Sequence, residues 1–252
     1  MFSKINTILV TIDAYVWGIP LIVLILSVGL FLTIRLKGVQ FTNLGRAFKY
    51  IFKDETDGKH GEVSSFAALC TALSATIGTG NIVGVATAIV SGGPGALFWM
   101  WLAALVGTAT KYAECLLAVK FRQVDEDGHV VGGPFNYIEH GMGPKWKWLA
   151  KIFAFFGIGV GLLGIGTFTQ VNGISSAVCN FFDPDKVNTI ALFGRDYSIA
   201  TIIAGLALTV CVGLVVIGGL KRIASVSQVV VPFMAIIYFV FAFIVIVTHI
   251  TA

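Results

Sequence analysis

Charged residues are scarce in this sequence of 252 residues, of which aspartate, glutamate, lysine and arginine together make up 12%. Soluble domains carry about 25% charged residues, so this chain lacks the polar surface that keeps a folded domain in water. The formal net charge is only +4, and the basic residues lie in the gaps between apolar runs. Nucleic-acid binding is therefore not expected, because it depends on basic residues gathered on one exposed face.

Cysteine is also sparse, and its spacing excludes two common uses. Cys70, Cys115, Cys179 and Cys211 show neither the paired spacing of a zinc site nor a disulfide framework. The four histidines have no acidic or cysteine partner at metal-ligand spacing. The sequence also lacks a nucleophile, base and acid constellation of the kind a membrane hydrolase needs. We therefore expect no enzyme activity and no cofactor held by the protein.

Apolar runs are abundant, with 57% hydrophobic residues and a mean hydropathy of +0.91. About 20 apolar residues cross the hydrocarbon core of a bilayer. On that basis we place about six spans, at residues 14–36, 64–91, 95–119, 149–178, 198–219 and 228–250. The first run is too long for the apolar part of a cleaved signal peptide, so we expect it to be retained. The prediction is a single all-α transmembrane domain covering residues 1–252.

The distribution of lysine and arginine predicts the orientation of these spans. Basic residues gather in the segments 35–59, 120–151 and 221–222, and the connections on the other side hold only three. This alternation places the first long loop in the cytoplasm and the N-terminus outside. Within that loop, apolar residues recur at helical spacing from Phe41 to Ile51 beside basic side chains, which favours an amphipathic helix on the membrane surface. A solvated linker is the alternative.

The tetrapeptide Gly78-Thr79-Gly80-Asn81 interrupts the second span. In hydrocarbon every peptide N–H and C=O must be satisfied, so irregular backbone at that depth survives only where it lines a cavity. An unwound midpoint presents N–H groups to anions and free carbonyls to cations. The alternative is a closely packed helix crossing, because Gly80 and Gly84 also have Gly-xxx-Gly spacing. The asparagine beside two glycines favours a binding site and hence a transporter.

Two other spans carry polar residues at membrane depth. Lys111 and Glu114 lie three residues apart and so on one helix face. Ionisable residues in a membrane usually mark function, but mutual pairing explains both, so a structural or gating ion pair is favoured over a substrate site. The fourth span contains the buried amides Gln170 and Asn172 close to Thr169. Hydrogen bonding between helices would also account for these residues.

After the interruption the chain makes a glycine-proline turn and then presents a group of aromatic residues, as at a membrane interface. The segment reads Gly92-Gly93-Pro94-Gly95-Ala96-Leu97-Phe98-Trp99-Met100-Trp101-Leu102-Ala103-Ala104-Leu105-Val106-Gly107. From end to end it resembles the diagnostic pattern of the sodium:alanine symporter family. The preceding Gly-Thr-Gly-Asn is similar to the broken helix of that family, and the resemblance runs over the whole chain.

The resemblance implies a sodium-coupled importer of small neutral amino acids, alanine or glycine, in the plasma membrane of a bacterium or archaeon. It also implies a LeuT-like fold, in which two five-helix repeats are inverted relative to each other. The first span would be an extra helix, and spans two to six would form the first repeat. The second repeat is not in this sequence. A non-transporting fragment and a channel-like subunit therefore stay open as alternatives.

The same resemblance implies roles for particular residues. The amides of Thr79 and Gly80 and the side chain of Gln170 would bind the substrate. Asn81 would contact both substrate and sodium, the latter through its side-chain carbonyl. Sodium would also be bound by the backbone carbonyls of Ser74, Thr76 and Ile77. The implied partners are thus a small neutral amino acid, the sodium ion that drives its transport, and the surrounding lipid.

Overall fold

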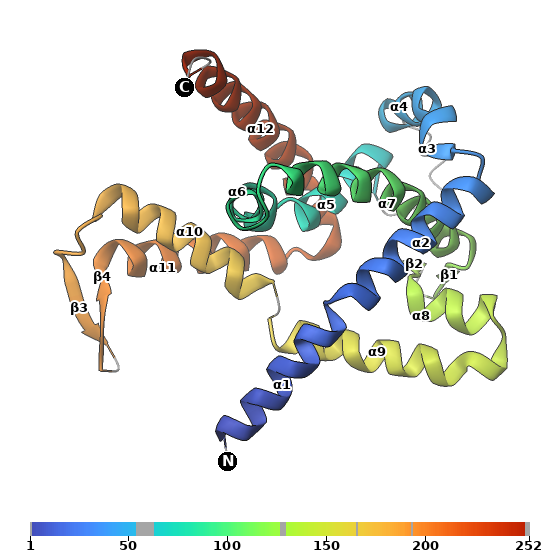
Figure 1. Cartoon of the computed structure of the whole chain (residues 1–252), viewed down its shortest axis with the longest axis horizontal. Helices are drawn as coiled ribbons and strands as arrows, with labels where there is room; N and C mark the ends of the chain where they lie inside the picture. Colours follow the sequence, from blue (N-terminus) through green and yellow to red (C-terminus); the bar gives the residue numbers. More distant parts are fainter. Residues whose placement is uncertain (1, 54–62, 127–129, 165, 193, 250–252) are drawn as a thin grey trace. The chain divides into compact units, whose positions relative to one another are not determined.

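The computed structural model of the chain describes residues 2–53, 63–126, 130–164, 166–192 and 194–249, and most of these are helical (Figure 1). The chain divides into two compact units. Unit 1 comprises residues 1–49 and 87–155, and unit 2 comprises residues 50–86 and 156–252. Residues 54–62, which belong to the first basic segment of the sequence, lie outside the described residues.

Unit 1 is built mainly on the long helices α2 and α7. Its elements, some of which continue into unit 2, are α1 (Phe2–Val16), α2 (Ile19–Arg35), α3 (Val39–Thr42), α4 (Leu44–Phe52), α7 (Gly95–Lys120), β1 (Gln123–Val124), β2 (Val130–Val131), α8 (Pro134–Asn136), the π-turn Tyr137–Gly141, the 3-10 turn Pro144–Trp146 and α9 (Lys147–Leu162). Helices α2 and α7 approach closely at Gly29, where an added Cβ would stand 2.9 Å from the Val106 carbonyl oxygen. Small residues of this kind allow helices to pack closely in a membrane.

Unit 2 contains the interrupted second span. Its elements are α5 (Ser65–Thr76), the first part of α6 (Thr79–Gly92), the end of α9, α10 (Thr167–Phe182), β3 (Thr189–Leu192), β4 (Arg195–Ser198), α11 (Ile199–Val216) and α12 (Gly219–Thr248). Helix α5 packs on α12 through small buried residues, Ala67 and Cys70 on one side and Ala224 and Ser227 on the other. Helix α10 packs on α11.

Among the described residues, five helical runs are long and apolar enough to cross a membrane, and α5 with α6 makes a sixth if the bent pair counts as one span. Runs of this length and composition indicate a multi-pass membrane protein. Several helices extend beyond the expected spans. Helix α12 begins at Gly219 instead of about 228, because hydropathy detects the apolar stretch of a helix and not its polar first turns.

The expected fourth span, 149–178, is two helices in the structure. Helix α9 ends at Leu162 and α10 begins at Thr167. Between them Gly164 and Gly166 have φ values of 61° and 90°, in the left-handed region that glycine enters without steric cost. The glycines of this span therefore mark a second interruption, which we did not predict.

The connections hold structure that an all-α prediction leaves out. Strands β1 and β2 pair antiparallel, with Gln123 opposite Val131. Strands β3 and β4 form another antiparallel pair, with Thr189 opposite Ser198 (Figure 1). In the first loop, α3 and α4 are helical, and the apolar side chains of Leu44 and Phe48 are exposed as in an amphipathic surface helix.

Asp183 holds the base of the β3–β4 hairpin. Its buried carboxylate accepts one hydrogen bond from the Ser198 hydroxyl at 2.6 Å and one from the Val187 backbone N–H at 2.9 Å. The Ser198 bond is the largest of the interactions that hold the pKa of Asp183 below its ordinary value, and backbone N–H groups of Val187 and Asn188 add to it, against the opposing effect of burial. Asp183 therefore ties the end of α10 to the start of α11.

Candidate functional site

The interruption of the second span lies between α5 and α6, which meet at an angle of 44°. Helix α5 ends at Thr76, Ile77 is extended with φ −84° and ψ 114°, and α6 begins at Thr79. Of the tetrapeptide 78–81, only Gly78 lies outside a helix, and the other three residues form the first turn of α6. The break is thus shorter than the sequence suggested.

At the C-terminal end of α5, several carbonyl oxygens have no hydrogen-bond partner among the described residues. Within the described residues, Ile77 N–H donates to Leu73, and the carbonyls of Ser74, Thr76 and Ile77 accept no hydrogen bond. The Ala75 carbonyl, which we did not single out from the sequence, also accepts no hydrogen bond from the described residues. The last carbonyls of any helix lack an intrahelical donor, and here no cap replaces it. A cluster of free carbonyl oxygens at the negative end of a helix dipole suits a hard cation.

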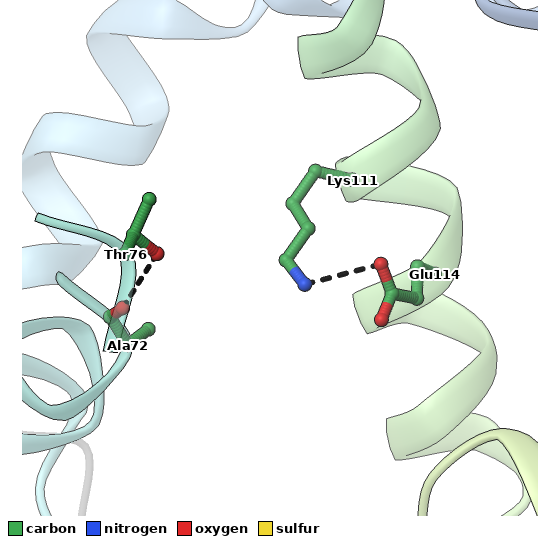
Figure 2. A network of polar contacts seen from close by, with 4 residues as sticks. All are labelled: Ala72, Thr76, Lys111 and Glu114. Carbon is green, nitrogen blue, oxygen red and sulfur yellow. Dashed lines mark hydrogen bonds and ion pairs between the residues drawn. The ribbon is translucent and has the colours of Figure 1, made fainter. Parts of the chain in front are cut away.

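The hydroxyl groups of α5 do not satisfy these carbonyls. The Thr71, Ser74 and Thr76 hydroxyls donate back to carbonyls three or four residues earlier, at 2.7 to 2.8 Å. Figure 2 shows the Thr76 bond to the Ala72 carbonyl. Serine and threonine in helices commonly bond in this direction. The free carbonyls therefore stay available to a ligand.

The N-terminal end of α6 presents the opposite chemistry. Its first N–H, that of Thr79, donates to the Gln170 Oε1 atom at 2.9 Å. The next N–H, that of Gly80, donates to no residue in the part of the chain that the structure describes. The Asn81 N–H closes a turn onto the Gly78 carbonyl at 3.0 Å. An amide at a helix N-terminus is suited to bind an anion such as a carboxylate.

Two glycines allow α10 to lie against this end of α6. An added Cβ at Gly78 would clash with the Gln170 amide group, standing 2.9 Å from both its Cδ and its Oε1 atoms. An added Cβ at Gly173, one turn beyond Gln170, would stand 2.5 Å from the Thr79 Cγ2 atom. Gly173 did not emerge from the sequence as a site residue. The only available signal was its position one turn from Gln170, on the same face of the helix.

The other polar candidates take no part in this arrangement. The side chains of Asn81, Thr169 and Asn172 are exposed and form no hydrogen bond with the described residues. Asn81 is nevertheless in the first turn of α6, next to the Gly80 amide. Ser227 on α12 is a further neighbour that we did not predict, with its hydroxyl 3.4 Å from the Ser74 hydroxyl. Helix α12 thus lies beside the carbonyl end of α5.

In unit 1, the ion pair expected on the third span is present on α7. Figure 2 shows the Lys111 Nζ atom 3.1 Å from the Glu114 Oε2 atom, with both side chains on one helix face. Both side chains are partly exposed, at 65% and 42% of their full accessibility. The predicted pairing is confirmed, since each charge is accounted for by the other.

Comparison with known proteins identifies the family of this chain. The model of the sodium:alanine symporter family matches residues 2–252. The chain belongs to the sodium:alanine symporter family. This agrees with the resemblance that the glycine-tryptophan segment and the interrupted helix indicated from the sequence.

Relatives of this symporter family support the assignment. An "Uncharacterized transporter" of Haemophilus influenzae is 54% identical over 93% of this chain and 47% of its own length. The "Sodium/alanine symporter AgcS" of Methanococcus maripaludis is 44% identical over 90% of this chain and 48% of its own length. The "Probable sodium/glutamine symporter GlnT" of Bacillus subtilis is 34% identical over 93% of this chain and 45% of its own length. The chain spans about half the length of the curated relatives it matches.

Proposed function

We propose that this chain is the N-terminal part of a sodium-coupled symporter that carries a small neutral amino acid, alanine or glycine, by alternating access. The observation that carries the proposal is the break between α5 and α6, where free carbonyls and helix-terminal N–H groups face the same interruption. The family adds the class of substrate, since its description names sodium and alanine. One relative carries the name of a sodium/alanine symporter.

The carboxylate of the amino acid would bind at the start of α6. The Gly80 N–H is free among the described residues, the Thr79 N–H is beside it, and the helix dipole favours negative charge there. Gln170 would contact the same carboxylate from α10, since its amide already lies at this point. Asn81 would add a polar group on the next residue of the turn.

Sodium would bind at the end of α5. The carbonyls of Ser74, Thr76 and Ile77 have no donor within the described residues, and oxygen is the ligand that a hard cation prefers. The Asn81 side-chain carbonyl would add a ligand from α6, so that one break would hold both the cation and the substrate. Half-helix ends are used in this way in transporters with interrupted helices. Binding of one partner would thereby favour binding of the other.

The remainder of the architecture follows from the same proposal. Spans two to six would form one repeat of a LeuT-like fold, and a second repeat would complete the site in a protein as long as the relatives. The N-terminus would lie outside the plasma membrane, with the long basic loops in the cytoplasm. Lipid would surround the many exposed apolar side chains, of which Val90 and Ile217 are each 86% exposed.

The test is uptake of radiolabelled alanine into proteoliposomes that contain the intact protein. We expect accumulation driven by an inward sodium gradient and none when potassium replaces sodium. Asn81→Ala should raise the sodium concentration needed for half-maximal uptake about tenfold or more, because a charge-assisted contact is lost. Asn180→Ala is the matched control, since Asn180 is also exposed on a helix of unit 2 but lies more than two turns from Gln170. If alanine uptake is the same with potassium in place of sodium, and the same in Asn81→Ala as in the wild type, the proposal is refuted.

A further inference from the structure

The Gln170 side chain occupies the place that the proposed function gives to the substrate carboxylate. Its Oε1 atom accepts the first N–H of α6 at 2.9 Å, and this N–H is one of the two assigned to the carboxylate. A carboxamide oxygen and a carboxylate oxygen are both acceptors, so each can satisfy the same donor. One of the two N–H groups assigned to the carboxylate is therefore already bonded to a side chain of the chain itself.

We propose that the Gln170 side chain caps α6 while no substrate is bound and is displaced when a carboxylate arrives. This inference rests on the proposed function, because it describes how that site is regulated. Without the cap, the Thr79 N–H would lack a partner at membrane depth, which is costly. With it, the empty break keeps its shape, and only a stronger acceptor displaces the amide.

The strength of the two hydrogen bonds determines whether Gln170 or the carboxylate accepts the Thr79 N–H. Hydrogen bonds to a charged acceptor are about twice as strong as bonds between neutral groups. A substrate carboxylate therefore outcompetes the neutral Gln170 oxygen for the Thr79 N–H. The released amide can then turn its Nε2 donors toward the carboxylate, so one side chain is an acceptor in the empty site and a donor in the loaded site. Gln170 thus selects for a carboxylate over a neutral carbonyl.

Gly78 provides the space that this cap requires. An added Cβ there would stand 2.9 Å from the Cδ and Oε1 atoms of Gln170, so the amide lies directly over the residue in the break. Gly78 does not have a positive φ, so alanine fits its backbone. The clashing atoms are the far end of a flexible side chain. Gly78→Ala would therefore expel the Gln170 amide without altering Gln170.

Amide hydrogen exchange at Thr79 tests the cap without any substrate. We expect the Thr79 N–H of the intact, empty protein in nanodiscs to exchange slowly, and to exchange at least about tenfold faster in Gln170→Ala and in Gly78→Ala, as for a lost capping bond. Gly84→Ala is the matched control on the same helix, because its added Cβ would meet only the Thr79 carbonyl oxygen, at 4.0 Å. Unchanged exchange in both Gln170→Ala and Gly78→Ala would overturn the inference.

Stopped-flow measurement of alanine binding then tests the competition. Gln170→Ala should raise the association rate constant about two- to tenfold, since no cap has to be displaced. Gln170→Glu should lower it at least about tenfold, because a tethered carboxylate caps α6 permanently and repels the ligand. If alanine binds but Gln170→Ala leaves its association rate unchanged, the inference fails and the proposed function stands. If alanine does not bind the wild-type protein while the Thr79 exchange still depends on Gln170, the proposed function fails, and the competitive role fails with it.

Discussion

The Gln170 side chain on α10 and the Thr79 backbone on α6 are joined by a 2.9 Å hydrogen bond between residues 91 positions apart in the sequence. This bond fixes α10 to the interruption of the second span. It satisfies one of the N–H groups that every helix leaves unpaired at its start. It lies next to the end of α5, where the carbonyls of Ser74, Thr76 and Ile77 accept no hydrogen bond from the described residues. We propose that an anionic and a cationic group bind at this break.

The close contact of Gly173 with Thr79 gives a prediction about packing. Gly173→Ala would place a Cβ 2.5 Å from the Thr79 Cγ2 atom, and overpacking of this kind costs about 1–3 kcal/mol. We expect a lower melting temperature of the purified protein and slower alanine uptake. Thr79→Ser removes the Cγ2 methyl group, so the double variant Gly173→Ala/Thr79→Ser should recover most of the loss. Gly157→Ala is the control, since its added Cβ meets no atom within 4 Å.

The Lys111–Glu114 pair gives a prediction about charge balance. Glu114→Gln leaves Lys111 without the partner seen at 3.1 Å, and Lys111→Met does the same to Glu114. An unpaired charge at the centre of a membrane helix costs up to about 2.5–3.5 kcal/mol on insertion scales. Each single variant should therefore melt at a lower temperature than the double variant Lys111→Met/Glu114→Gln.

The uptake of that double variant separates the two roles left open for the pair. Retained alanine uptake indicates a structural pair, and lost uptake with normal melting indicates a role in gating or transport. Equal melting of the single and double variants would contradict any stabilisation by the pairing.

The hydrogen bonds accepted by the Asp183 carboxylate give a prediction about pH. Its pKa is lowered in the folded protein, first by the Ser198 hydroxyl. Its contribution to stability is therefore fully present above the ordinary aspartate pKa of about 3.9, and it is lost as the pH falls through the lower folded-state value. Asp183→Asn should reduce the hydrogen-exchange protection of the β3–β4 amides at pH 7.

The difference between wild type and Asp183→Asn should shrink once the pH falls below about 4, after correction for intrinsic exchange. Asp185→Asn is the control, because Asp185 is exposed and forms no bond within the described residues. Equal protection of wild type and Asp183→Asn at pH 7 would show that the carboxylate does not hold the hairpin.

Local chemistry made part of this structure predictable. A glycine-rich polar tetrapeptide in an apolar run indicated an interruption of the helix. Backbone at membrane depth is irregular only where its polar groups are buried in protein or line a cavity. The structure places that interruption between Thr76 and Thr79. The pairing of Lys111 and Glu114 followed from their spacing of three residues on one helix.

Other features depend on contacts or conformations that a single sequence does not reveal. The partner of the Thr79 N–H comes from another helix, so its identity requires the packing of α10. The interruption at Gly164 and Gly166 was missed because Gly157, Gly159 and Gly161 precede it inside a continuous helix. Composition alone does not distinguish a helical glycine from a left-handed one. The β3–β4 hairpin was missed because strands of four residues are too short for an alternating pattern to distinguish them from a loop.

The central claim is that one break binds both sodium and the amino acid. The most direct measurement is the dissociation constant of alanine for the intact, reconstituted protein, without sodium and at saturating sodium. We expect sodium to tighten alanine binding by a factor of about 5–150, and alanine to tighten sodium binding by the same factor, since coupling is reciprocal. An alanine dissociation constant that is the same with and without sodium would contradict it.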